Sequence, residues 1–457
     1  MLRKIRLTCG IICLTLITLL FLDFTGTLHS WFGWLAKIQF LPAVLALNVG
    51  VVVLLIILTG VFGRIYCSVI CPLGVFQDVA AWIGKKRKKL PYSYSPALSL
   101  LRYGALAIFI ITLVAGVSFI ATLFAPYSAY GRIANNLFQP IWLWGNNLFA
   151  HLAERAGSYA FYEVDIWIKS LPTFIVAAAT FVILILLAWR NGRTYCNTIC
   201  PVGTVLGFLS RYSLFRIIID TEKCNKCGLC ARHCKAACIN AKEHTIDYSR
   251  CVVCMDCLGK CKQKALSFQL RITKARPAKA EENTHAASSK EVNEARRNFL
   301  TVTAMAATAS ALKAQEKKVD GGLAAIEDKK IPNRQTPITP PGSLSARNMA
   351  AHCTACQLCV SACPNQVLRP STNLMNLMQP EISYERGYCR PECNDCSQVC
   401  PTGAIQMIVA EPEKETSPQI PAINTERCIG CGACENLCPA RPFSAIYVEG
   451  HERHRII

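Results

Sequence analysis

The chain has 457 residues, enough for about three ordinary domains. Hydrophobic residues make up 52% of it and charged residues 17%, which excludes an intrinsically disordered protein. Its 49 Lys and Arg against 29 Asp and Glu give a formal net charge of +20, which would ordinarily indicate binding to polyanions. Its 27 cysteines stand mostly in tight CxxCxxCxxxC runs, which suit metal binding better than disulfides. The chain is neither short nor led by a cleavable signal, so a secreted disulfide framework is not expected.

Four apolar stretches are long enough to cross a bilayer, which takes about 20 helical residues. They cover residues 5–22, 40–62, 104–124 and 171–189, within a predicted membrane domain of residues 1–219. Basic residues gather on one side of these stretches, whereas loops 23–39 and 125–170 are poorer in positive charge. The basic residues are Arg3, Lys4, Arg6, Lys85, Lys86, Arg87, Lys88, Lys89, Arg190 and Arg193. The positive-inside rule therefore predicts four transmembrane helices with both ends of this unit in the cytoplasm.

A repeated motif follows the second and fourth stretches. It reads GRIYCSVICPLG at 63–74 and GRTYCNTICPVG at 192–203, with the cysteine pairs Cys67/Cys71 and Cys196/Cys200. Both copies lie on the same side of the membrane, so a pseudo-twofold axis along the membrane normal would bring four sulfurs together. We interpret the four thiols as a metal or redox site, the alternative being a device that only terminates and packs each helix. Cys9 and Cys13 lack the flanking motif and are expected to be ordinary core residues.

A predicted two-cluster ferredoxin module occupies residues 220–270. Its two runs are CNKCGLCARHC and CVVCMDCLGKC, which have the spacing of bacterial [4Fe-4S] ferredoxins. Three cysteines of each run would hold one cubane while the fourth reaches the neighbouring cluster, so Cys234 completes the second cluster and Cys261 the first. Zinc is the weaker alternative, because it needs four ligands rather than an interlocked eight. Cys238 is left over and is expected to be structural. The eight ligands are Cys224, Cys227, Cys230, Cys234, Cys251, Cys254, Cys257 and Cys261.

Residues 271–350 form a predicted linker that contains a possible export signal. Arg296 and Arg297, followed by a mildly apolar segment, resemble a twin-arginine signal, a route that carries folded, cofactor-loaded domains. Cleavage at 309–311 and retention of 296–313 as a fifth span are both open. The alternative is a cytoplasmic linker with a chance Arg-Arg pair.

A second ferredoxin module, residues 351–457, contains three further cysteine runs, each followed by proline. The cysteines are Cys353, Cys356, Cys359, Cys363, Cys389, Cys393, Cys396, Cys400, Cys428, Cys431, Cys434 and Cys438. They predict three cubanes, but an odd number of runs leaves the pairing of the fourth cysteines open. Strands are expected at 404–409 and 445–448. In total the sequence predicts five [4Fe-4S] clusters and leaves a sixth metal site in the membrane repeat open. Five clusters at about −2 each would neutralise about half of the positive charge, so nucleic acid is not an expected partner.

These motifs resemble a known group of membrane ferredoxins. Residues 1–261, with two GRxYCxxxCP motifs and paired cluster runs, resemble the NapH-type membrane ferredoxin of periplasmic nitrate reductase systems. They are also similar to the nitrous-oxide-reductase regulator and to cytochrome-oxidase-assembly polyferredoxins. Residues 290–457 resemble the exported NapG-type partner of NapH, but with three cluster runs where that partner has four. The resemblance implies a quinol dehydrogenase subunit that passes electrons from the membrane quinol pool to a periplasmic reductase or cytochrome.

The predicted architecture is thus a membrane α-helical bundle of four transmembrane helices plus two α+β, bacterial-ferredoxin-like 4Fe-4S modules. We expect it in the bacterial inner membrane, with the first module in the cytoplasm and the C-terminal module in the periplasm. In the alternative function, an assembly or regulatory factor handles copper or another metal through the four cysteines of the membrane repeat. No catalytic residue is assigned. Candidate acceptors for quinol protons on the outer side are Asp23, His29, His151, Glu154, Glu163 and Asp165.

Overall fold

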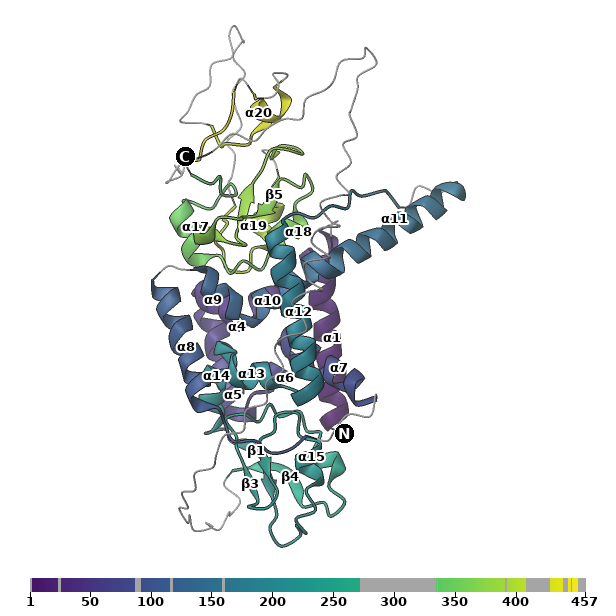
Figure 1. Ribbon diagram of the computed structural model, residues 1–457, viewed down its shortest axis with the longest axis vertical. Coiled ribbons are helices and arrows are strands. Elements are labelled where there is room, and N and C mark those ends of the chain that lie inside the picture. The colour runs from purple at the N-terminus through teal and green to yellow at the C-terminus, as the bar shows by residue number, and fades with distance from the viewer. Residues whose placement is uncertain are drawn as a thin grey trace, which may run out of the picture.

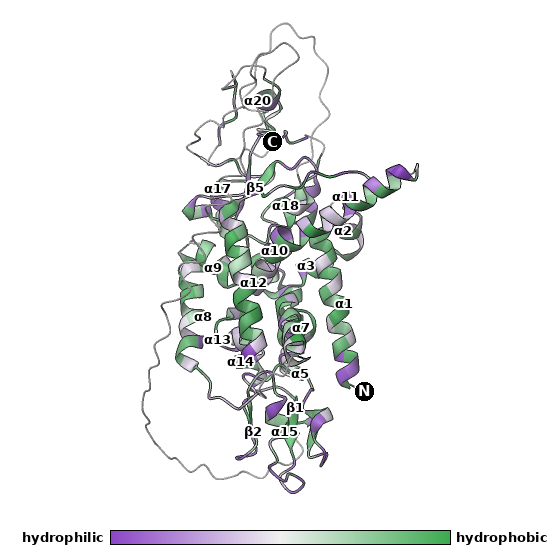
Figure 2. Cartoon of the chain, turned by 45° about the vertical axis from the view of Figure 1, so that its right-hand side comes forward, coloured by the Kyte–Doolittle hydropathy of each residue, from purple (hydrophilic) through white to green (hydrophobic). Residues whose placement is uncertain are grey.

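The computed structural model describes residues 2–23, 26–86, 92–115, 118–157, 161–271, 334, 336–390, 393–407, 428–438, 443–444 and 446–450. A bundle of helices forms its middle, and a small cysteine-rich module lies at each end (Figure 1). The apolar residues concentrate in the bundle and the hydrophilic ones toward the two ends (Figure 2).

Two helices are long and apolar enough to cross a membrane. They are α1, Leu2–Leu22, and α12, Leu171–Asn191. Only 33% of the most apolar stretch of α1 and 22% of that of α12 is buried, whereas the core helix of a water-soluble protein would be mostly covered. Their outer faces carry exposed Ile11, Ile12, Ile183 and Leu186, which suits contact with lipid.

The other two predicted spans are each divided. The stretch 40–62 forms α4, Phe40–Leu45, and α5, Val49–Phe62. The chain breaks between them where Leu47 has a positive φ of 52°, and the side chain of Asn48 accepts a hydrogen bond from the Val51 amide to begin α5. The stretch 104–124 falls within α8, Ser99–Val114, and α9, Ser118–Phe124. Four continuous membrane-crossing helices are therefore not present in the described part of the chain.

The two sequence repeats fold alike and interlock. The first consists of α5, α6 (Ile65–Val69) and α7 (Pro72–Lys86), and the second of α12, α13 (Thr194–Thr198) and α14 (Pro201–Ser210). Helix α12 of the second repeat packs along α7 of the first, and α14 of the second packs on α5 of the first. Each repeat thus completes the other, as the predicted pseudo-twofold relation requires.

The motif arginines also cross between the repeats. Arg64 donates to the carbonyl oxygen of Cys196 at 3.0 Å, and Arg193 donates to that of Cys67. Both arginines are completely buried. The glycine near the end of each motif makes room for them, because a methyl group on Gly74 or Gly203 would overlap a cysteine carbonyl and approach the incoming guanidinium.

The first ferredoxin module closes the end of the bundle that carries the N-terminus (Figure 1). Strand β1, Phe215–Ile219, pairs antiparallel with β4, Leu266–Leu270, and brackets the cysteine loops. Strands β2, Ile239–Asn240, and β3, Thr245–Ile246, form a second short ladder. Helix α15, Leu229–Arg232, packs on the 3₁₀ turn η2, Leu258–Lys260. The module therefore begins at Phe215, before the predicted boundary at residue 220.

The opposite end of the bundle is formed by several shorter elements. They are α2 (Thr27–Phe32), α3 (Trp34–Lys37), α10 (Pro126–Ile133), the π-helix η1 (Ala134–Phe138) and α11 (Gln139–Arg155). Helix α11 projects sideways from the bundle (Figure 1). It exposes Ile141, Trp142, Trp144 and Phe149, an aromatic-rich surface of the kind found at membrane–water interfaces.

The second ferredoxin module sits on this end. Its described elements are α17 (Ala346–His352), α18 (Leu358–Ala362), β5 (Leu368–Pro370), η3 (Leu374–Asn376), β6 (Pro380–Ile382), α19 (Asp395–Val399) and α20 (Ala433–Leu437). Strands β5 and β6 pair antiparallel. The strand expected from residue 404 is absent over 404–407, the described part of that stretch, and no strand forms at 446–448.

Buried polar contacts fix this module to the bundle. Asn135 and Asn136 of the π-helix both donate to the side-chain oxygen of Gln357, at 3.1 and 2.9 Å. Lys169 bridges Asn135 and the carbonyl of Val360 at 3.1 and 3.3 Å. A π-helix often marks a functional position in a helical protein. Here it supplies the surface on which a cysteine loop docks.

Because the two arginines pass close to the motif glycines, we predict that alanine is not tolerated at those glycines. We expect Gly74→Ala and Gly203→Ala each to cost about 1–3 kcal/mol, the usual cost of overpacking. Gly104→Ala in α8 is the control, because a methyl group there meets no atom within 4 Å and helix propensity favours alanine. Thermal unfolding in detergent would measure all three. Equal melting temperatures for the three variants would contradict the close packing.

Candidate metal centres

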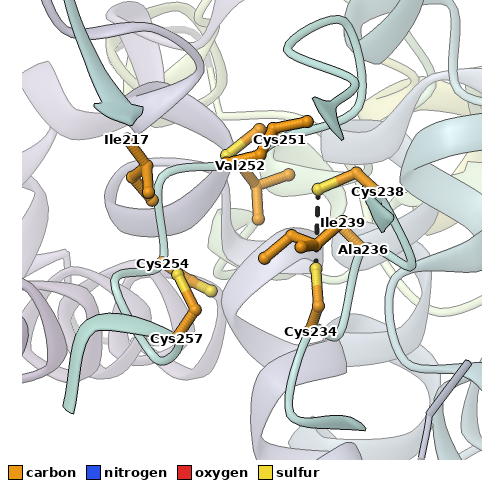
Figure 3. A pocket seen from close by; sticks show the side chains of 10 residues that line it. Ile217, Cys234, Ala236, Cys238, Ile239, Cys251, Val252, Cys254 and Cys257 are labelled. Carbon is orange, nitrogen blue, oxygen red and sulfur yellow. Dashed lines mark hydrogen bonds between the residues drawn. The ribbon is translucent and has the colours of Figure 1, made fainter. Parts of the chain in front are cut away.

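An apolar hollow in the first ferredoxin module is lined by cysteines from both of its runs (Figure 3). Cys234, the fourth cysteine of the first run, lies there together with three cysteines of the second run, Cys251, Cys254 and Cys257. Ile217 of β1 is among the apolar side chains that close it. These four thiols are the set that the exchange rule assigns to the second cluster.

Cys238, expected to be structural, also lines this hollow. Its sulfur lies 3.5 Å from that of Cys234, and only 1% of the residue is exposed (Figure 3). It also lies within electrostatic range of Cys251. A fifth thiol thus stands beside two ligands of the second cluster. Spacing alone could not show this, because Cys238 lies outside the four-cysteine run.

The remaining four ligands gather in the other half of the module. Cys230 lies within electrostatic range of Cys224 and Cys227. Cys261 shares an apolar cluster with Cys230, and its sulfur accepts a hydrogen bond from the Ala265 amide at 3.3 Å. The packing of α15 on η2 brings these two parts of the chain together.

The CxxC loops share an unusual backbone. In four runs the residues immediately before and after the second cysteine have positive φ. They are Lys226 and Gly228, Val253 and Met255, Ala355 and Gln357, and Gly430 and Gly432. Left-handed backbone costs a residue other than glycine about 1–2 kcal/mol. Its recurrence in four loops therefore indicates that the loop conformation has a function. Such turns aim successive N–H groups into a concavity that suits an anionic group, which fits a thiolate-ligated cluster.

Buried charges anchor the first module to the bundle. Lys235 contacts Asp256 at 2.9 Å and Asp78 of α7 at 3.5 Å, and Arg3 of α1 contacts Asp256 at 2.7 Å. Burial alone would raise the pKa of Asp256, but Lys235 and the hydrogen bond from Arg3 outweigh it and lower the pKa. Lys235 stands where such runs usually have proline, and its ammonium group joins the module to the bundle.

Burial affects the ligand thiols in the opposite direction. It raises the pKa of Cys254 to about 12, with Asp256 adding to the effect, and that of Cys396 to about 12. These thiols therefore keep their protons at neutral pH until a metal centre binds. Cluster insertion must release those protons, since the thiolate is the ligand.

In the second ferredoxin module the first two runs exchange their fourth cysteines. Helices α18 and α19, which belong to these runs, pack against each other. Cys400 lies within electrostatic range of all three leading cysteines of the first run, Cys353, Cys356 and Cys359. Cys363 correspondingly lies near those of the second run, which are Cys389, Cys393 and Cys396. The structure thus suggests two complete four-cysteine sets.

The third run stands beside these two sets. Cys434 lies within range of Cys428 and Cys431. The Cys389 amide donates to the Cys431 carbonyl at 2.9 Å, which places the third run next to the second. Because the first two sets are filled by their own exchange, the third run is left with its own four cysteines, including Cys438.

The four cysteines of the repeats lie in one buried core, each 4% exposed. Cys200 is within electrostatic range of Cys67, Cys71 and Cys196. Among the described residues, no three His, Cys, Asp or Glu side chains gather closely enough to hold a single metal ion. Cys9 and Cys13 lie apart on α1, exposed and half-exposed. The linker with Arg296 and Arg297 lies outside the described residues.

Comparison with known proteins supports the iron–sulfur assignment. Residues 44–91 and 173–221 match the sequence profile of a 4Fe-4S binding domain, and residues 388–441 match that of a 4Fe-4S dicluster domain. No solved structure matches the chain.

The chain is also similar to two ferredoxin-type proteins and to a regulatory protein. It is 26% identical to ferredoxin-type protein NapH of Haemophilus influenzae over 50% of this chain and 70% of that protein. It is 27% identical to methylamine utilization ferredoxin-type protein MauN of Methylobacillus flagellatus over 47% of this chain and 64% of that protein. Regulatory protein NosR of Stutzerimonas stutzeri is 25% identical over 43% of this chain and 23% of its own length. The chain is therefore an iron–sulfur electron-transfer protein related to the NapH, MauN and NosR polyferredoxins.

The exchange seen in the second module differs from the pairing that the dicluster profile suggests. That profile spans the second and third runs, whereas the structure joins the first and second. Cys400→Ala should therefore damage the same cluster as Cys353→Ala, and the double variant should lose no more iron than either single variant. The double variant that combines Cys400→Ala with Cys428→Ala should damage two clusters. It should lose about four more irons than either single variant.

Iron counting and EPR on anaerobic protein would measure these losses. The profile's pairing would be established instead by the opposite pattern. The iron losses would then add when Cys400→Ala is combined with Cys353→Ala, and would not add when it is combined with Cys428→Ala.

Proposed function

We propose that this protein takes electrons from membrane quinol and delivers them through its 4Fe-4S centres to a periplasmic reductase or cytochrome. The observation that carries the proposal is the placement of cluster-binding modules at both ends of an apolar bundle (Figures 1 and 2). The relation to NapH supports it. When bound, Cys-ligated cubanes supply one-electron transfer, with potentials set by charge, hydrogen bonds and solvent exposure.

The topology we propose places the first ferredoxin module in the cytoplasm and the C-terminal module in the periplasm. Arg3, Lys4 and Arg6 mark the end of α1 at the first module, and basic residues favour the cytoplasmic side. Asp23 follows the other end of α1, on the side where the C-terminal module docks. An export signal at Arg296 and Arg297 would bring that module across the membrane, in the manner of a NapG-like partner fused to a NapH-like chain.

The outer end of α1 offers a proton acceptor for quinol. Asp23 accepts hydrogen bonds from the amides of Gly26 and Leu28 at 3.0 and 2.8 Å, which fix its carboxylate. The His29 ring lies 3.8 Å from that carboxylate, and its side chain is 8% exposed. Neither ring nitrogen has a hydrogen-bond partner within the described part of the chain. A neutral imidazole nitrogen can accept a proton that quinol loses on oxidation.

The other candidate acceptors on this side differ from the Asp23–His29 pair. His151, Glu154, Glu163 and Asp165 are all exposed to solvent. Phe21, two residues before Asp23, also contributes to the packing at Gly131, where the Cys356 carbonyl of the C-terminal module lies. The Asp23–His29 pair therefore lies near the docking surface of that module.

The test is reduction of anaerobically purified, cluster-replete protein by a water-soluble quinol analogue, followed by bleaching of the visible absorbance. We expect reduction by the analogue and a rate about 100-fold lower for His29→Gln, the loss typical of removing a proton acceptor. His151→Gln, in the exposed part of α11, is the matched control and should react like the wild type. Dithionite would confirm that both variants carry reducible clusters.

Failure of the wild type to be reduced would overturn quinol oxidation itself. Equal rates for the two variants would overturn only the role of His29.

A further inference from the structure

The four cysteines of the repeats occupy a buried site with strongly positive surroundings. Twenty of the 27 cysteines belong to the ferredoxin runs, and three others, Cys9, Cys13 and Cys238, lie elsewhere. The remaining four share the core in which the two repeats interlock. This core lies between the two ferredoxin modules, at the level of α6 and α13 (Figure 1).

Hydrogen-bond donors surround these sulfurs. Cys200 begins α14, and its sulfur accepts a hydrogen bond from the Gly203 amide at 3.3 Å. Cys71 directly precedes α7 and accepts in the same way from the Gly74 amide. Gln77 donates to the sulfur of Cys196 at 3.2 Å. Each helix N-terminus contributes about +0.5 elementary charge, so two helices favour negative charge at this place.

A buried arginine adds positive charge that no carboxylate in the described chain contacts. The guanidinium of Arg64 is fully buried and reaches to 3.9 Å from the Cys67 sulfur. Its other partners in the described chain are the oxygens of Asn197, Ser249 and Cys196, none of them a carboxylate.

A second arginine lies beside the first. Arg102 is 3% exposed and donates to the same Ser249 carbonyl at 3.0 Å. The Asp247 carboxylate, which accepts from the Ser249 hydroxyl at 2.6 Å, offsets part of the charge of Arg102. Asp78 contacts Arg6 and Arg193 at 2.8 Å and Lys235 at 3.5 Å. A buried cation without an anion costs several kcal/mol, so an anionic group beside Arg64 would stabilise this core.

We propose that Cys67, Cys71, Cys196 and Cys200 together hold one [4Fe-4S] cluster between the two repeats. Each thiol would release its proton on binding, and four thiolates around the cubane give a net charge of about −2, which would offset the charge of Arg64. The proposal goes beyond the function above, since it depends on neither quinol nor the final acceptor.

The match to the family profile favours a cubane over a single ion. The 4Fe-4S binding profile matches each repeat, and each matched segment contains only two cysteines. One segment cannot supply four ligands, but the two interlocked segments can.

Native mass spectrometry of the anaerobically reconstituted full chain, with iron and sulfide analysis, tests the proposal directly. We expect six clusters, or about 24 irons, rather than the five, or about 20, that the ferredoxin runs can hold. A sixth cluster has no other place, because only three further thiols remain, those of Cys9, Cys13 and Cys238, and a cubane needs four. Saturation at five clusters would overturn the proposal, as would one zinc or copper ion held by these four cysteines.

A variant with all four cysteines changed to serine provides the second measurement. It should lose about four irons while the EPR signals of the ferredoxin clusters persist, and those signals also report that the chain has folded. The matched control, Cys9→Ser with Cys13→Ser, removes another pair of thiols spaced four residues apart and should keep the iron content of the wild type. Unchanged iron in the four-serine variant would refute the site. If that variant lost every cluster, the cluster count of the wild type would decide.

Discussion

The exchange of arginines between the two repeats is the interaction on which the rest of the bundle depends. Each guanidinium leaves its own repeat and donates to the cysteine carbonyl of the other, so each repeat supplies a hydrogen bond to the cysteine turn of its partner. The exchange requires a glycine where each guanidinium passes, and it brings α12 against α7 and α14 against α5. A motif of twelve residues thereby joins the two halves of the helical bundle and places four thiols in one core.

Both ferredoxin modules are joined to this bundle through buried polar contacts rather than through flexible attachment alone. At one end Arg6 of α1 donates to the carbonyl of the ligand Cys254 at 3.1 Å. At the other end Gln357, which lies inside a cysteine loop, accepts from the π-helix asparagines. In each case the contacting residue belongs to a cluster loop or touches one. A change in the charge of a cluster would therefore act most strongly on the bundle residues packed on it, because electrostatic interactions between buried groups are poorly screened.

The sequence was informative about ligands and less so about partners. Cysteine spacing identified every candidate ligand, and in the first module the exchange rule placed Cys234 with the second run, as the hollow shows. Hydropathy identified α1 and α12, but it merged α4 with α5, because Leu47 and Asn48 break the helix without interrupting the apolar pattern. The crossing of Arg64 and Arg193 could not be predicted, since one sequence does not show which carbonyl a side chain reaches. The closeness of Cys238 to Cys234 depends in the same way on how the loop folds back.

The two motif arginines differ in their charged partners. Asp78 balances Arg193 of the second repeat, yet Gln77, its neighbour in sequence, directs a neutral amide at Cys196, and Arg64 of the first repeat meets no carboxylate. The pseudo-symmetry is thus kept in the backbone and in the thiols but not in the acids. An acid paired with Arg64 would cancel the positive potential at the four sulfurs and would favour neutral thiols there. With no carboxylate on Arg64 among the described residues, its positive charge remains beside the four sulfurs, where the proposed cluster would balance it.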